Sequence, residues 1–210
     1  IVAGDLLLVY WADYNTNTSS ITVPAGWTTL YNAQNGNRRY AAFYKVADGT
    51  EGATINFATS VNEVAAQTSY RISKGSYTGV PLAAATAATG SSTGSNPPAL
   101  TSGFGAVNTL WIAASHSGGT SISSYPTNYT LSQVSANTGN NDLTHASMAI
   151  AARQLLATND DPANFTLAAS RNWTAQTIAI QGAAVVGSIP SSTVGTITIR
   201  NGHTVTLDAN

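Results

Sequence analysis

The feature that most constrains the fold of this chain is that its second half resembles its first. Five short blocks recur in the same order at an offset of about a hundred residues. The pairs are Asp5–Val9 with Asn108–Ile112, Ile21–Thr28 with Ile122–Thr130, Tyr40–Ala47 with His145–Ala152, Ala53–Phe57 with Ala163–Leu167, and Ala65–Ile72 with Trp173–Ile180. Chance similarity would not keep that order, so we interpret the pattern as an internal duplication.

The repeated blocks have the composition of β-strands. They are apolar runs rich in Val, Ile, Tyr, Phe and Trp, bounded by clusters of Gly, Pro, Asn and Ser. The candidate strands are Asp5–Trp11, Trp27–Tyr31, Tyr40–Val46, Thr54–Phe57, Ala65–Ile72, Thr109–Ala114, Tyr129–Val134, Ser147–Arg153, Asn164–Ala168 and Thr174–Gln181.

The predicted fold is an all-β, antiparallel β-sandwich over residues 1–182. Each half, 1–72 and 105–182, would supply four or five strands with one open apolar face, and two sheets packed face to face close it. A jelly roll, eight strands from two Greek keys, is what such a duplication would give. Two separate five-strand domains are the alternative.

Three segments lie outside these halves. Residues 73–104 are rich in Ala, Thr, Ser, Gly and Pro, and we expect this linker to cross the sandwich surface or form an outer arm. Residues 183–195 form a second linker, and 196–210 alternate apolar and polar residues around Asn201-Gly202, which predicts a β-hairpin or the start of a further β module. Because a lone hairpin is marginal in water, this tail needs a partner. The chain opens at Ile1 without Met, which we interpret as a processed or trimmed N-terminus.

Composition narrows the classes of partner. Only 8% of residues are charged, against about 25% in an average soluble domain. The eight basic residues are scattered, whereas a nucleic-acid surface needs them clustered, so no nucleic-acid partner is expected. No apolar run reaches the roughly 18 residues of a membrane span, so no membrane insertion is expected. The absence of Cys excludes disulfides, thiol nucleophiles and Cys-based metal sites.

One segment formally matches a catalytic motif. Gly90-Ser91-Ser92-Thr93-Gly94 fits the nucleophile-elbow pattern G-x-S-x-G, which requires a strand before it and a helix after it. Here it lies in the Gly/Ser/Thr linker and is followed by two prolines. We therefore assign Ser92 no catalytic role.

Histidines and paired acids give no stronger signal. His116, His145 and His203 lack metal-ligand spacing and are expected on the surface or at strand ends. Asp48 with Glu51, and Asp160 with Asp161, look like strand-connecting turns; a structural Ca²⁺ or a glycosidase pair are the lesser alternatives. The predicted sets of catalytic, cofactor-binding and metal-binding residues are thus empty.

Loop aromatics suggest one binding alternative. Trp11, Tyr14, Tyr125 and Tyr129 lie near a pair of equivalent loops and could stack on sugars, although core or rim packing is the more common role of such residues. The glycosylation sequons at Asn17, Asn128, Asn164 and Asn172 follow from abundant Asn and Thr.

Several blocks also resemble a known group of proteins. Gly4–Val9, Val23–Thr28, Tyr44–Gly52 and Asn108–Ala114 are similar to tailed-bacteriophage structural proteins of the minor tail, tail-fibre or capsid-decorating kind. The likeness covers about residues 1–182 and resides in packing and turn residues, so no catalytic residue carries over.

The resemblance implies a non-enzymatic virion protein that acts in assembly and surface adhesion. Its expected location is the virion surface. Its expected partners are further copies of the chain and other virion proteins, with host-surface glycans as a further class. The alternative is a carbohydrate-binding module of a secreted or cell-surface protein.

Overall fold

The structure is a computed structural model that describes residues 1–14, 20–83, 86–139 and 144–184. These residues contain no helix and form antiparallel sheets. The predicted hairpin at 196–210, with His203, and all but the first two residues of the linker at 183–195 lie outside the described residues, as does Asn17.

The first sheet contains the four long strands of the first half, in the order β3–β4–β1–β6. Their bounds are β1 Leu6–Tyr14, β3 Thr28–Gln34, β4 Arg38–Val46 and β6 Val64–Ile72. β1 pairs along its whole length with β4 on one side and with β6 on the other. A short pair, β2 (Ile21–Thr22) with β5 (Ala58–Thr59), lies outside this sheet. Residues 54–57 are not a strand, contrary to the prediction.

The second sheet has the order β11–β15–β10–β13–β12. Its strands are β10 Val107–Gly118, β11 Ile122–Ser124, β12 Leu131–Asn137, β13 Ala146–Ala157 and β15 Phe165–Gln181. β15 unites two of the predicted strands in one. A separate small pair joins β9 (Leu100–Thr101) to β14 (Asn159–Asp160).

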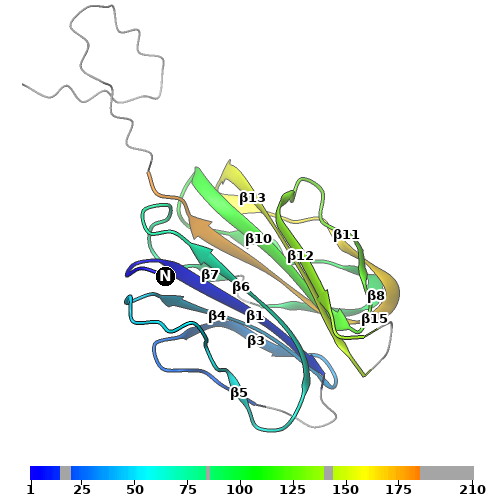
Figure 1. Ribbon diagram of the computed structural model, residues 1–210. Helices are drawn as coiled ribbons and strands as arrows, with labels where there is room; N and C mark the ends of the chain where they lie inside the picture. The colour runs from blue at the N-terminus through cyan, green and yellow to red at the C-terminus, as the bar shows by residue number, and fades with distance from the viewer. Residues whose placement is uncertain (15–19, 84–85, 140–143, 185–210) are drawn as a thin grey trace, which may run out of the picture.

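The two sheets pack face to face around one apolar core (Figure 1). Alternate residues point inward, as the period of a strand requires. The fully buried inward side chains include Leu6, Leu8 and Tyr10 of β1, and Met148 and Ile150 of β13. The predicted antiparallel β-sandwich is therefore confirmed.

The four long strands of each half lie in the same relative order, since β12–β13–β10–β15 matches β3–β4–β1–β6. In both halves the first of these strands lies beside the third, whereas a Greek key places it beside the second. The jelly roll is thus not confirmed, and the duplication stays a prediction. The proposed block alignment also pairs Leu8, which points inward, with Trp111, which points outward. That block is misaligned by an odd number of residues.

The segment 73–104, predicted as a linker that crosses the sandwich surface or forms an outer arm, adds strands to the second sheet. β8 (Ala88–Ser95) and β7 (Leu82–Ala83) both pair with β15. Gly and Ser have low strand propensity, so β8 is not visible in the sequence. Gly90 is needed there, because a Cβ atom at this position would overlap the indole of Trp173.

Candidate functional site

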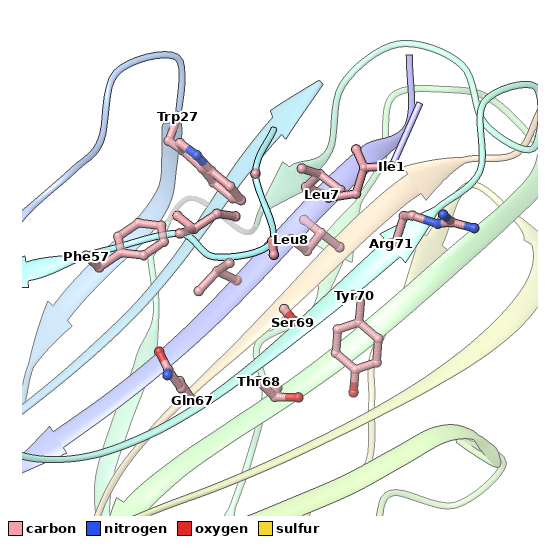
Figure 2. A pocket seen from close by; sticks show the side chains of 14 residues that line it. Ile1, Leu7, Leu8, Trp27, Phe57, Gln67, Thr68, Ser69, Tyr70 and Arg71 are labelled. Carbon is pink, nitrogen blue, oxygen red and sulfur yellow. The ribbon is translucent and has the colours of Figure 1, made fainter. Parts of the chain in front are cut away.

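The candidate site is a groove of about 660 Å³ on the outer face of the first sheet (Figure 2). That volume lies within the range of small-ligand pockets. β1 lies along its floor, residues 52–57 and Trp27 form one wall, and β6 forms the other.

The floor and one wall of the groove are apolar. Leu7 and Val9 point outward from β1, alternating with the core residues Leu6 and Leu8. Trp27 and Phe57 meet edge to face with ring centroids 5.4 Å apart, and Phe57 stacks on Phe43 at 4.8 Å. Residues 54–57 leave the sheet to cover this face, which explains why they form no strand.

The opposite rim is polar. Gln67, Ser69 and Arg71 are exposed and alternate along β6 on the outer face. Figure 2 shows Trp27 and Phe57 together on one side of the groove and Arg71 on the other. The groove therefore combines an aromatic wall with an amide, a hydroxyl and a guanidinium group as hydrogen-bonding groups.

Asp5 holds the end of this rim in place. Its buried carboxylate accepts hydrogen bonds from the backbone N–H groups of Val2 and Lys74, both at 3.0 Å. These bonds, together with Arg71 at 3.7 Å, lower the pKa of Asp5 despite the opposing effect of desolvation. The Arg71 side chain stays 54% exposed at the mouth of the groove.

Ser92 lies within the exposed strand β8, not at the strand-to-helix turn that a nucleophile elbow needs. Its hydroxyl accepts a hydrogen bond from the Trp173 indole N–H at 3.0 Å and donates one to the Gly94 carbonyl at 2.8 Å. These bonds give Ser92 a structural role in attaching β8 to β15.

His116 was expected on the surface or at a strand end, in a Ser/Gly loop; it lies near the end of β10, but a surface position is wrong because the residue is fully buried. β10 continues four residues beyond its predicted end because Ser115–Ser117 pair with both β13 and β15, and Gly118 pairs with β13. His116 is fully buried between the sheets, and burial lowers its pKa to about 3, against a weaker opposing effect of a backbone hydrogen bond with Thr174. His145 directly precedes β13, in agreement with a strand-end position.

Asp48 and Glu51 form a charged turn with Lys45. Both carboxylates contact the Lys45 ammonium group, at 3.0 and 2.9 Å. Hydrogen bonds from Thr50, and then from Lys45, lower the pKa of Asp48 to about 2, and the bond with Lys45 also lowers the pKa of Glu51. Neither group is then the protonated acid that glycoside hydrolysis requires.

The two residues of the second acidic pair differ in burial. Asp160 is 2% exposed and accepts hydrogen bonds from Arg153 and from the Tyr129 hydroxyl, whereas Asp161 is exposed. The phenol ring of Tyr129 is also covered by the Arg153 guanidinium at 5.0 Å. Tyr129 and Asp160 therefore stabilise the outer face of the second sheet.

The four aromatics for which sugar stacking was the alternative do not share one surface, and the structure gives them the packing roles that are more common for such residues. Trp11 is 9% exposed on the outer face of the first sheet, and its indole N–H donates to Asp13 at 3.0 Å. Tyr125 packs on the opposite outer face against Phe165. Tyr14 is half-buried and contacts Arg38. Of the sequons, Asn128 and Asn164 are exposed and Asn172 is half-buried.

Two features escaped the sequence reasoning. The groove was not predicted because the residues of its rim have a sequence typical of any strand. The one sequence signal for it was Trp27, an aromatic residue beside a turn. The second is Asp13, which is 1% exposed. Burial and a hydrogen bond with Glu63 raise the pKa of Asp13 to about 7.

No group of three or more His, Asp or Glu side chains suited to a metal occurs among the described residues. In the same part of the chain, no helix has the length and apolar character needed to cross a membrane. Comparisons with protein-family models, curated proteins and solved structures found no match for this chain.

Proposed function

We propose that this chain is a non-enzymatic structural protein of a tailed-bacteriophage virion, present in multiple copies, which acts in assembly and surface adhesion. The proposal rests on the position in the fold of the residues that resemble phage structural proteins. Gly4–Val9 and Asn108–Ala114 form parts of β1 and β10 and the turn before β1, at the centre of the two sheets. These two blocks therefore lie in interior strands of both sheets, which supports a resemblance of the core fold.

The surface supports the same function. Only 8% of the residues are charged, and β8 consists of Ser, Thr and Gly apart from its first residue, Ala88. Neutral polar surfaces allow many copies to lie close together without the mutual repulsion that a high net charge produces. The groove on the first sheet would provide the adhesive contact.

The test is the location of the protein. Antibodies raised against the chain should label intact particles released from cells that carry the gene. Mass spectrometry of density-purified particles should recover its peptides in an amount that corresponds to many copies per particle. Protein found only inside the cells, or free in the medium, would contradict the proposal.

A carbohydrate-binding module is the second candidate, and the groove is the observation that favours it. Sugar rings pack on aromatic side chains through their apolar faces and hydrogen-bond through their hydroxyls, and Trp27 lies across from Gln67 and Arg71. A neutral or acidic glycan matches this arrangement.

A glycan array followed by calorimetry tests this candidate. Gln67→Ala and Arg71→Ala, both exposed, should each weaken binding about tenfold, the loss expected for one hydrogen bond of about 1.4 kcal/mol. Tyr125→Ala, on the other outer face, is the matched control and should bind like the parent protein. Binding unchanged in the first two variants would remove this candidate.

A further inference from the structure

We infer that two copies of this chain pair through their β6 strands, antiparallel about a two-fold axis at Thr68, to form one continuous eight-stranded sheet. The proposed function requires contacts between copies of the chain, and β6 would be the strand that makes one of these contacts. It rests on the geometry of the sheet edge and stands independently of the viral setting.

β6 is an edge strand. Its only strand partner among the described residues is β1, so no second described strand pairs with the other side of its backbone, although β6 also packs on β12 and β13 of the second sheet. β15, which has the corresponding place in the second sheet, is covered by β7, β8 and β11. The edge that is covered in one sheet is thus available in the other.

β6 also lacks the features by which proteins protect an exposed edge. Natural edge strands are interrupted by bulges or carry Pro and inward-pointing charges. Among the described edges, β3, β8 and β12 each pair with a register shift, whereas β6 pairs with β1 over nine consecutive residues without one. β6 contains no Pro, and its single charge, Arg71, points outward.

The sequence of β6 is complementary to itself in the antiparallel direction. Pairing centred on Thr68 places Val64, which is 40% exposed, opposite Ile72 of the second copy on the inner face. On the outer face, Gln67 faces Ser69 of the second copy. On the inner face, the pairing places no charged residue opposite an apolar one.

The charges at the two ends of the strand favour the same arrangement. Glu63 directly precedes β6 and Arg71 ends it, on the same outer face. In the antiparallel pair, Arg71 lies diagonally opposite Glu63 of the second copy, within reach of long side chains, and symmetry repeats this contact. A parallel pair would instead place like charges together.

The two-fold axis has a consequence for the groove. Because the axis is perpendicular to the sheet, both copies present the outer face of the first sheet in the same direction. The two grooves would then lie side by side, which would favour binding to a surface that presents many copies of one ligand.

A single-cysteine variant of the full chain tests the pairing directly, because the chain contains no Cys. Thr68→Cys should form a disulfide-linked dimer under mild oxidation, since residues facing each other across strands have Cβ atoms close enough for a disulfide. Ser91→Cys, exposed on β8 in the second sheet, should form no disulfide-linked dimer under the same oxidation. Equal cross-linking of the two variants would overturn the inference.

Sedimentation of the cysteine-free protein provides the second measurement. The parent should sediment at twice its 21.5 kDa chain mass. The variant Gln67→Lys/Ser69→Lys places like charges opposite each other and should raise the dimer dissociation constant about tenfold or more, with an unchanged circular dichroism spectrum. Ser91→Lys/Thr93→Lys on β8 is the matched control and should dimerise like the parent.

A monomeric parent protein, or a dimer that the β6 variant leaves intact, would overturn the inference. Either result would leave the virion proposal standing if the protein is found in particles. A β6 dimer formed by a protein that is absent from particles would support the β6 pairing and contradict the virion proposal.

Discussion

The imidazole ring of His116 and the phenol ring of Tyr40 lie 5.2 Å apart, centroid to centroid, across the interior of the sandwich. Tyr31 also contacts the imidazole, with its hydroxyl 3.4 Å from Nε2. His116 thus joins the second sheet to the first through an aromatic cluster in which the imidazole is fully buried, and this burial disfavours its charged form. This arrangement makes the stability of the sandwich dependent on pH.

Replacement of His116 by Phe should remove a part of the acid sensitivity. The folded-state pKa of His116, about 3, lies below its unfolded value near 6.5, so the unfolded chain takes up the proton first. The free energy of unfolding should therefore fall as the pH is lowered from about 6.5 to 3. Urea unfolding over this range should show a smaller fall for His116→Phe. His145→Gln is the control, and an equal fall in both variants would contradict the assignment.

Replacement of Asp13 by Asn should change the pH dependence of the free energy of unfolding in the direction opposite to that of the His116 replacement. The raised pKa, about 7, means that folded Asp13 keeps its proton at pH values where the unfolded chain has lost it. Its contribution to stability is present below about pH 4 and is lost as the pH rises to about 7. The asparagine variant should lack this loss. A parent-minus-variant difference that stays flat between pH 4 and 7 would show the assignment to be wrong.

Replacement of Asp160 by Asn should destabilise the second sheet by about 2–3 kcal/mol. The change removes the partner of Arg153 at a site where the carboxylate is 2% exposed, and breaking a buried ion pair is costly. Asp161→Asn changes the exposed neighbour and should stay within about 0.5 kcal/mol of the parent. Chemical denaturation of both variants measures the difference, and similar values for the two would contradict the role of Asp160.

Replacement of Gly90 by Ala should destabilise the protein by about 1–3 kcal/mol, because the new methyl group overlaps the Trp173 indole. Gly52→Ala is the matched control, since a Cβ at that position meets no atom within 4 Å. Thermal unfolding of the two variants gives the comparison. An unchanged midpoint for Gly90→Ala would show that β8 is not packed on Trp173.

The sequence by itself determined the fold class. Alternating apolar residues such as Leu6, Leu8 and Tyr10 require one buried face, and two such sheets can bury it only against each other. The acidic turn at Asp48 to Glu51 was also predictable from the sequence, because hydrogen bonds between residues close in the chain determine its conformation. These properties depend on neighbours in the sequence.

The tertiary structure alone decided which polar and aromatic residues are buried and which edges are open. His116 is buried because β13 and β15 lie on both sides of it, and Trp11 is covered by residues that come later in the chain. β8 is a strand because β15 offers hydrogen-bond partners to a Gly/Ser sequence with little strand propensity of its own. The groove and the β6 edge likewise arise from contacts between distant segments, which a local sequence pattern does not encode.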